Sequence, residues 1–295
     1  MLDFVAFPTS ITNEKDLDEL YSDSGFISSE NFYSSYKKAT KRLRIRSLTI
    51  LRQSRDRTIS NENYDPSEVN AYYMPSMNRF GITLFLLTRN IIHFLAITSG
   101  ILQPPFYFNS APIAMNFAGI GTVIGHEMVH GFDYDGSMYD DKGDYKNWWQ
   151  NETRKLYDEK TECFRRQYSD IIEPVTRKHV NGSLTIGDNL ADNVGLQLSY
   201  KAYKMYAATK DSKMDLKLPE SMESYSKEQL FFISFANLWC NDDSKDYLEE
   251  QIKYDAHAPG RFRAIVPPSN FDQFSKAFKC KEGSRMNPRK KCLLW

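Results

Sequence analysis

The chain has 295 residues, 14% of them aromatic, and it carries 38 basic and 38 acidic residues. This length can bury a large core, and the neutral balance leaves no dominant basic surface, so we expect no nucleic-acid partner. The N-terminus lacks the charged segment and long apolar core of a secretory signal. The longest apolar stretch, 82–98, is interrupted by Arg89, Asn90 and His93, so no membrane-spanning segment is expected.

The first elements are predicted to be a helix, a loop and a strand. Charged and apolar residues alternate at helical spacing over about 29–50, and Ser28 and Ser29 offer an N-cap. The basic residues within 37–46 are interpreted as a solvated helix face. A polar loop is predicted over 54–67.

Residues 69–73 are β-branched and aromatic, which predicts a strand. An extended peptide can pair with the edge of such a strand, and Asn70 could offer it an amide. Taken alone, Asn70 is more often the cap of a turn. The prolines that follow predict an extended, non-helical segment over 100–108.

The motif HExxH occupies His126 to His130, with Glu127 beside the first histidine. In an α-helix this spacing leaves the two imidazoles about 40° apart in azimuth and about 6 Å apart in rise, so both can reach one ion. The alternative is a surface helix with two solvated histidines. The preceding residues 117–125 are apolar and rich in glycine, which favours a buried helix that other backbone approaches closely. Buried histidines need a partner such as a metal.

An acidic loop over 133–144 follows, without the ligand spacing of an EF-hand. A helix is predicted from about Asn147 to Tyr168. Asp188 and Asp192 then lie four residues apart, so on a helix both carboxylates share a face. Because like charges there would repel each other, a third metal ligand and an orienting carboxylate are indicated. An N-capping aspartate remains the alternative.

The C-terminal part contains an apolar stretch, 230–240, that predicts a core helix and pocket wall. A histidine and arginines surround a Pro–Gly turn over 255–263, and such a loop could bring a cation to an oxyanion. A lone loop histidine is otherwise usually solvated. The four cysteines form no CxxC pair, so no structural zinc knuckle is expected. Two glycosylation sequons, at Asn151 and Asn181, are compatible with a secretory glycoprotein.

The order and spacing of these pieces match one family over nearly the whole chain. The chain resembles the neprilysin and endothelin-converting-enzyme family of zinc metallopeptidases, in its C-terminal catalytic part. The segments that carry the resemblance are Val69-Asn-Ala-Tyr-Tyr, GILQPPF (100–106), GxVIGHEMVHGFD (121–133), DNLAD (188–192), LFFISFANLWC (230–240), HAPGRFR (257–263) and the ending at Trp295.

The resemblance implies an α+β, predominantly helical, thermolysin-like zincin domain with a small edge sheet. This domain would span 61–295, after an N-terminal helical or linker remnant at 1–60. The implied activity is that of a zinc metalloendopeptidase with one zinc ion per chain. Its substrates would be short peptides, cut on the amino side of hydrophobic residues. The family is membrane-anchored or secreted, in the secretory pathway or outside the cell, although this chain shows no signal or anchor. Its oligomeric state is not indicated.

The resemblance also assigns roles to individual residues. His126, His130 and Asp188 would bind zinc, and Glu127 would be the general base. Asp192 and Asp133 would hydrogen-bond to the histidines and hold their rings in place, and His257 would stabilise the oxyanion. Asn70 and Ala71 would bind the peptide backbone, and Arg263 would bind a substrate carbonyl. Phe106, Val123 and Trp239 would form an apolar specificity pocket.

Three departures from the family pattern support an alternative function. Asp188 replaces the family's glutamate and is one methylene shorter. Residues 79–99 carry about fifteen extra, mostly apolar residues, so an insertion is expected there, and the family's N-terminal half is absent. The alternative is a catalytically impaired or inactive pseudopeptidase fragment that binds peptides or a partner. A calcium-binding acidic loop is the least supported hypothesis.

The resemblance further implies how the cysteines are used. Cys163 and Cys292 would form a disulfide. Cys240 and Cys280 would have lost partners that lay in the missing half.

Overall fold

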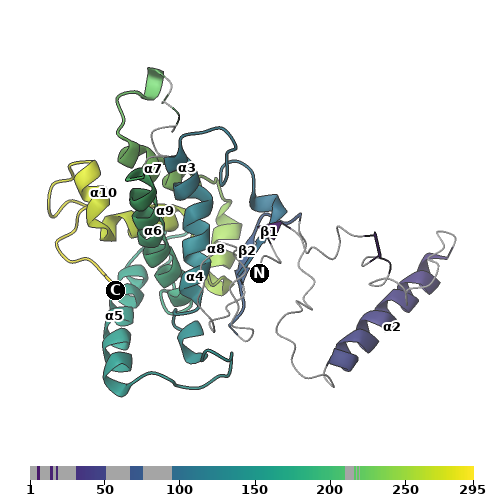
Figure 1. The fold of residues 1–295 in the computed structure, drawn as a ribbon. Coiled ribbons are helices and arrows are strands. Elements are labelled where there is room, and N and C mark those ends of the chain that lie inside the picture. The colour runs from purple at the N-terminus through teal and green to yellow at the C-terminus, as the bar shows by residue number, and fades with distance from the viewer. Residues whose placement is uncertain are drawn as a thin grey trace.

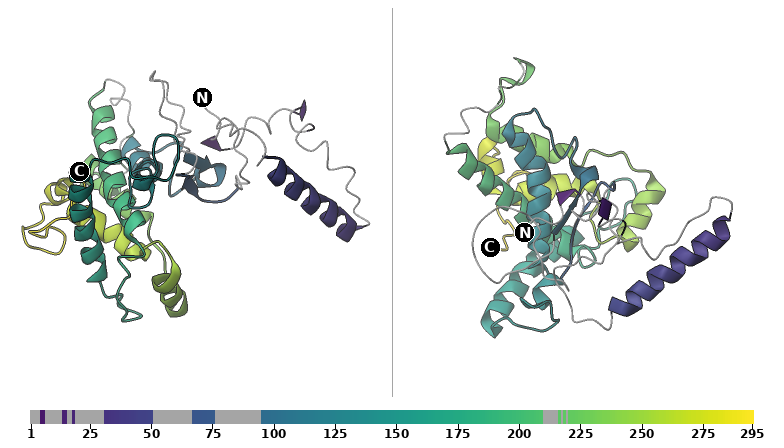
Figure 2. Two further views of the ribbon diagram at one scale, coloured as in Figure 1. Left: turned by 90° about the horizontal axis from the view of Figure 1, so that it is seen from below. Right: turned by 45° about the vertical axis from the view of Figure 1, so that its right-hand side comes forward.

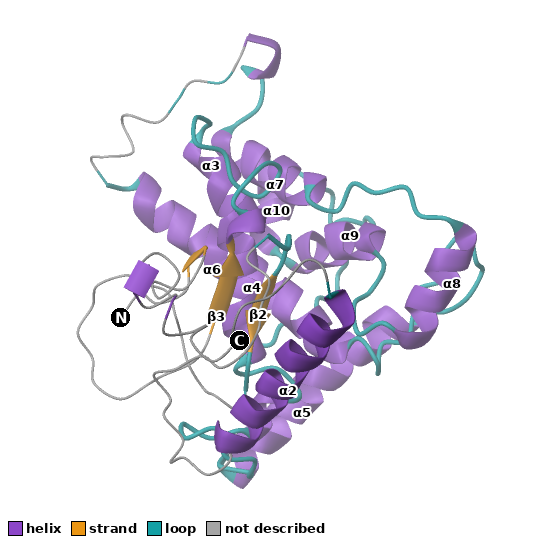
Figure 3. Cartoon of the chain, turned by 90° about the vertical axis from the view of Figure 1, so that its right-hand side faces the viewer, coloured by secondary structure: helices purple, strands orange, loops and turns teal. Residues whose placement is uncertain are grey.

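The computed structural model describes residues 5–6, 14–15, 18, 31–50, 67–75, 95–209, 216, 218 and 220–295. Most of the described chain is helical, with one small sheet beside the helices (Figures 1 and 3). This architecture confirms the predicted fold class. None of the described helices is both long and apolar enough to cross a bilayer.

The sheet has the strand order β1-β3-β2, formed by β1 (Val5–Ala6), β2 (Ala71–Tyr73) and β3 (Leu95–Thr98). β2 pairs antiparallel with β3, and β1 pairs with β3 in parallel. The predicted strand at 69–73 is therefore present, at the outer edge of the described sheet. β3 belongs to the stretch 79–99 that was predicted as an insertion, so at least its last residues take part in the fold. Residues 76–94 lie outside the described residues, as does most of the predicted loop at 54–67.

The N-terminal helix α2 (Phe32–Ile50) agrees with the predicted helix over 29–50. Its first turn is closed by Asn31, whose Oδ1 accepts a hydrogen bond from Ser34 N at 3.2 Å. The serines predicted as caps lie outside the described residues. α2 lies to one side of the helical body (Figures 1 and 2).

A continuous helical run over 113–130 passes through the centre of the molecule. It consists of α3 (Ile113–Asn116), the π-helical segment η4 (Phe117–Gly121) and α4 (Thr122–His130). The prediction of a buried helix closely approached by other backbone is confirmed at both ends. A Cβ on Gly119 would lie 2.2 Å from Phe106 O, and one on Gly125 would lie 2.6 Å from Gly195 O. Only glycine permits such contacts.

The long helix α6 (Ile186–Ala207) packs against α4 through Gly125 and Gly195. One apolar cluster on α6 joins Leu196, Tyr200 and Tyr203 to α7 (Lys227–Asn237). A second cluster joins Leu190 and Val194 to α5 (Asn151–Ser169) and the C-terminus. Because α6 is the common wall of both clusters, it is held rigidly where it faces α4.

Short elements complete the chain. They are η3 (Ser99–Ile101), η5 (Gly136–Met138), η7 (Glu220–Met222), α8 (Lys245–Tyr254), α9 (Gly260–Asn270) and α10 (Asp272–Ala277).

Three local predictions were wrong. Residues 100–108 form η3 and a series of turns rather than an extended segment, with Phe106 N donating to Gln103 O at 2.9 Å. The reason is that proline's fixed φ also suits turns. α5 begins at Asn151 rather than Asn147, because Trp149 Nε1 reaches back to Ser137 O at 2.8 Å. The Pro–Gly pair after His257 starts helix α9 rather than a turn, because the carbonyl of the N-cap residue Pro259 accepts hydrogen bonds from Phe262 N and Arg263 N.

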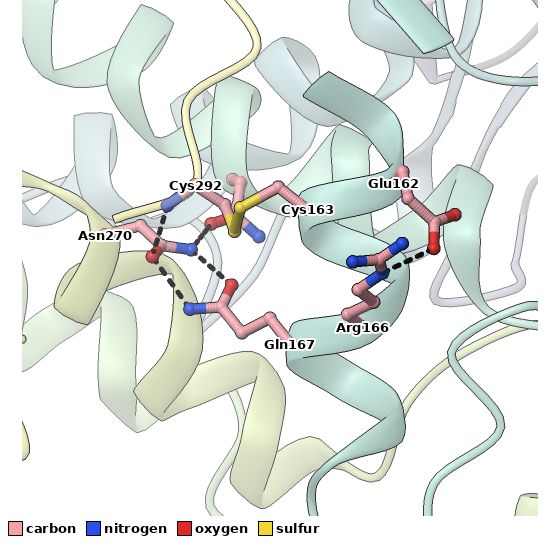
Figure 4. Close-up of a disulfide and its surroundings, with 7 residues drawn as sticks. Glu162, Cys163, Arg166, Gln167, Asn270 and Cys292 are labelled. Atoms are coloured by element: carbon pink, nitrogen blue, oxygen red, sulfur yellow. Dashed lines mark hydrogen bonds and ion pairs between the residues drawn. A yellow bond between two sulfur atoms is a disulfide. The ribbon is translucent and has the colours of Figure 1, made fainter. Parts of the chain in front are cut away.

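The predicted disulfide between Cys163 and Cys292 is present, with an S–S distance of 2.03 Å (Figure 4). It fastens the C-terminal segment to α5. Beside it, Asn270 accepts hydrogen bonds from Cys292 N and Gln167 Nε2 and donates one to Asn193 of α6. A disulfide fits an oxidising compartment. Cys240 and Cys280 are free thiols, and the loss of partners outside this chain remains a prediction.

Candidate active site

Two histidines of α4 point their Nε2 atoms at one place. The two Nε2 atoms are 3.0 Å apart, and the rings meet edge to face with centroids 4.6 Å apart. His126 is buried and His130 is partly buried. The helical spacing of the HExxH motif therefore brings both nitrogens within reach of a single ion, and the solvated-surface alternative is wrong.

Asp188 supplies the third group from the first turn of α6. Its Oδ1 lies 3.5 Å from His126 Nε2 and 3.9 Å from His130 Nε2. Atoms about 2.0–2.1 Å from a tetrahedral zinc ion lie about 3.3 Å from each other. The three measured separations, 3.0, 3.5 and 3.9 Å, bracket that value.

The unsatisfied oxygen of Asp188 favours a cation at this point. Oδ1 is buried and makes no hydrogen bond of acceptable geometry with any residue that the structure describes. A buried carboxylate oxygen in that condition is costly unless a cation binds it. The set of two imidazoles and one carboxylate matches the ligands of catalytic zinc sites. Within the described ranges, these three residues are also the one cluster of possible metal ligands. The aspartate, despite its shorter side chain, thus reaches the site.

Each histidine is oriented from behind by a second carboxylate. His126 Nδ1 lies 2.8 Å from Asp192 Oδ1, and His130 Nδ1 lies 2.6 Å from Asp133 Oδ2. A hydrogen bond of this kind selects the tautomer whose Nε2 lone pair faces the metal. The carboxylates come from different elements, since Asp192 lies one turn beyond Asp188 on α6 and Asp133 follows the end of α4.

Asp192 is also held by a cation. Arg263 donates from Nε and Nη2 to the two Asp192 oxygens, both at 2.7 Å. The guanidinium carbon lies 3.9 Å from the centroid of the Trp239 ring. Burial alone would raise the pKa of Asp192, but the charge of Arg263 and the hydrogen bonds from His126 and Arg263 bring that pKa well below its usual range.

His126 itself is strongly affected by these neighbours. Burial lowers its pKa, but the neighbouring carboxylates of Asp188 and Asp192 outweigh burial and raise the pKa of His126 to about 10. A metal ion must therefore displace a proton from this ring when it binds.

A cavity of about 440 Å³ opens over the three possible metal ligands. Every site residue predicted from the sequence lines this cavity or the metal site within it. They are Asn70, Ala71, Phe106, Val123, His126, Glu127, His130, Asp133, Asp188, Asp192, Trp239, His257 and Arg263. The structure thus brings together residues that are 193 positions apart in the sequence, and their individual roles remain predictions.

The walls of the cavity differ in character. The edge strand β2 contributes Ala71, and Asn70 comes directly before the strand, where its Oδ1 accepts a hydrogen bond from Ala71 N at 2.9 Å. Phe106 and Val123 belong to an apolar cluster under β2, together with Ile101. Glu127 is buried beside the two histidines, with 6% of its surface exposed. His257 comes from the loop before α9, and its Nε2 lies 3.1 Å from Asp188 Oδ1.

Sequence reasoning missed several residues of the site. Asp255 Oδ1 lies 2.7 Å from His257 Nδ1 and accepts a hydrogen bond from His257 N at 2.8 Å, so it orients that ring. Its signal was the Asp-x-His spacing, which lets a short side chain turn back to the ring. Tyr73 of β2 also lines the cavity, where burial, with a contribution from the charge of Asp133, raises its pKa. Asp135 lines the cavity as well.

The fold and this cluster of possible metal ligands have the architecture of a zincin domain. The chain belongs to the family "Peptidase family M13", whose model matches residues 70–294. It is 38% identical to Neprilysin-1 of Trittame loki and 35% identical to endothelin-converting enzyme 1 of Rattus norvegicus. These alignments cover 100% and 99% of this chain but only 39% and 35% of the two relatives. The chain therefore spans less than two fifths of the length of these relatives.

Solved structures show the same fold. The crystal structure of the Mycobacterium tuberculosis zinc metalloprotease ZMP1 with an inhibitor matches 90% of this chain, with 28% identity and a TM-score of 0.74. The Haemonchus galactose-containing glycoprotein complex matches 94% with 29% identity and a TM-score of 0.77. The matches cover 38% and 43% of those chains.

Proposed function

We propose that the chain is a zinc metalloendopeptidase that hydrolyses short peptides on the amino side of hydrophobic residues. The observation that carries the proposal is the convergence of His126, His130 and Asp188 beside the buried Glu127, within a cavity that also holds a strand edge and an apolar pocket. One zinc ion per chain would occupy the ligand set. When bound, zinc would polarise the scissile carbonyl and lower the pKa of water toward about 7.

Substrate binding would use β2 and the apolar wall. An extended peptide would lie along the edge of β2, with Asn70 and Ala71 bonding to its backbone. The hydrophobic side chain that follows the scissile bond would enter the space beside Phe106, Val123 and Trp239. Arg263 would bind a substrate carbonyl through the guanidinium hydrogens that Asp192 leaves unused.

Glu127 would move the proton. Its carboxylate would take a proton from the attacking water and pass it to the leaving amine nitrogen, as a general base and then a general acid. His257 would hold the developing oxyanion, since its Nε2 faces the Asp188 oxygen and Asp255 fixes the ring from the other side. Asp192 and Asp133 would keep the two histidine rings in place.

The proposal is tested by hydrolysis of a quenched peptide with one hydrophobic residue, by the zinc-loaded full chain and by Glu127→Gln. Losing the base is expected to reduce kcat/KM by roughly 10²–10⁴-fold while zinc content stays the same. Cleavage should map to the amino side of the hydrophobic residue. A wild-type chain that holds zinc but cleaves none of a set of such peptides would refute the proposal and favour the inactive, peptide-binding alternative. The distances at Asp188 give that alternative no support.

A further inference from the structure

The charges around the cavity are not balanced. Among the described residues, five carboxylates line it, against a single guanidinium, that of Arg263. A zinc ion would add two positive charges, which leaves a net charge of minus two when the histidines are neutral. A cavity with this excess of negative charge attracts cations.

Four of the five carboxylates have an evident partner or task. Asp188 faces the metal position, Asp192 binds His126 and Arg263, and Asp133 binds His130. Glu127 lies beside the reacting centre. Asp135 is different: no described residue forms an ion pair with its carboxylate, and its side chain does not cap the following turn η5.

Asp135 lies at the opposite end of α4 from the apolar pocket. Val123 is near the start of α4, where Ile120 N also donates to Phe106 O at 2.7 Å. The chain then passes the two histidines, and after α4 ends it folds back, so that a Cβ on Gly136 would lie 1.8 Å from His130 O. The nine-residue helix is about 13 Å long. The metal site therefore lies between the apolar pocket and Asp135.

Two further features make this end of the cavity favourable for a positive group. The C-terminal carbonyls of α4 carry partial negative charge, which stabilises cations. A second cavity, of about 290 Å³, meets the first at Asp135 and offers room for a long side chain. Arg154, the one cation among the described residues of its wall, is compensated by Asp158 at 2.9 Å and donates a hydrogen bond to Ser137 Oγ.

We propose that Asp135 is a specificity-determining residue that binds a protonated amine of the peptide on the amino-terminal side of the scissile bond. The amine is either a basic side chain or the α-ammonium group of the peptide. This inference rests on the proposed function, because the hydrophobic pocket sets which end of the peptide reaches Asp135.

The test uses peptides that share one hydrophobic residue after the scissile bond. An N-acetylated set carries lysine or norleucine at each of the three preceding positions in turn, and a further norleucine peptide has a free amino terminus. The proteins are the zinc-loaded wild type, Asp135→Asn and Asp141→Asn. The last makes the same charge change at an exposed residue of the same loop that does not line the cavity.

The wild type is expected to favour one cationic peptide by about fivefold in kcat/KM, the size expected for a partly exposed ion pair. Asp135→Asn should abolish that preference, measured as the ratio of kcat/KM for the cationic and norleucine peptides, and Asp141→Asn should keep it. A preference for lysine identifies a side-chain subsite, whereas a preference for only the free amino terminus identifies the α-ammonium group. Equal preferences in Asp135→Asn and the wild type would overturn the inference.

Binding of the same peptides to zinc-loaded Glu127→Gln, measured by calorimetry, separates the two proposals because it needs no turnover. Peptides that bind with the cation preference but are not cleaved by the wild type would contradict the proposed function alone. Equal affinities for lysine, norleucine and free-amine peptides would contradict the role of Asp135 alone.

Discussion

The two histidines of the metal site are supported in different ways. Behind His126, Asp192 is almost fully buried and is bonded at both oxygens by Arg263, which in turn stacks on Trp239. Behind His130, Asp133 accepts hydrogen bonds from the backbone N–H groups of Asp135 and Gly136, at 2.9 and 2.7 Å, and no lysine or arginine that the structure describes pairs with it.

The carboxylate charge is therefore neutralised behind His126 and remains behind His130. On the His126 side the ion pair closes a buried network, so removing one member leaves an unpaired charge. On the His130 side the negative charge persists and extends to Asp135. Burial, with a contribution from the charge of Asp133, raises the pKa of Asp135.

The largest expected effect is on folding, from Arg263→Met. This change leaves Asp192 buried without its cation and is expected to destabilise the chain by roughly 3–5 kcal/mol in denaturant unfolding of the zinc-free protein. Arg261→Met is the matched control on the same helix, since Arg261 is exposed, and it should change stability by less than about 0.5 kcal/mol. Equal effects of the two substitutions would show that the buried pair is not a special feature of the His126 side.

On the His130 side we expect a substitution to reduce metal affinity and to destabilise the fold less than Arg263→Met does. Asp133→Asn keeps the acceptor for the backbone N–H groups but weakens the hold on His130, so zinc affinity should fall by about 10–100-fold. Competition with a chromophoric chelator measures this, and unfolding of the metal-free variant provides the comparison with Arg263→Met. If Asp133→Asn unfolds the chain as readily as Arg263→Met, the contrast between the two sides is wrong.

The pH dependence of zinc binding should report on His126. Because its folded pKa is raised above the ordinary 6.5 to about 10, the metal-free protein holds this proton at neutral pH. Zinc affinity should therefore rise by about tenfold per pH unit between pH 7 and 8, with release of a proton. In the metal-free protein the stabilising contribution of this proton is complete below pH 6.5 and is lost as the pH rises through about 10. Calorimetry in buffers of different ionisation enthalpy counts the protons, and a release of none would contradict the assignment.

The smallest effect on the site is expected from Asp255→Ala, because Asp255 contacts neither His126 nor His130. His257 would lose the acceptor that orients its ring, so kcat should fall about threefold to tenfold with little change in KM, less than the loss of about 100-fold expected for His257→Ala. The double variant should be no worse than His257→Ala, because the two residues act as a unit. Asp242→Ala, which removes an exposed aspartate that precedes α8 and does not line the cavity, is the control. Additive losses of kcat in the double variant would mean that Asp255 does not act through His257.

The motifs could be recognised in the sequence because their chemistry depends on local spacing. Two histidines four residues apart share a helix face wherever that helix lies, and the same holds for Asp188 and Asp192. The strand at 71–73 and the helices α2, α6 and α7 follow from local pattern. Helix ends were less predictable. α5 starts at Asn151 because the Trp149 side chain donates a hydrogen bond to Ser137 O in the loop before it.

The helix face that carries the histidines, the family to which the chain belongs and the identities of the groups around the cavity could all be inferred from the sequence. Whether Asp188 reaches the histidines could not, since that depends on how closely Gly125 and Gly195 let two backbones approach. The pairing of Arg263 with Asp192, and the lack of a described counter-ion at Asp135, likewise became visible only in the folded chain. Charge compensation depends on distances between residues far apart in the chain, and sequence spacing carries no record of those distances.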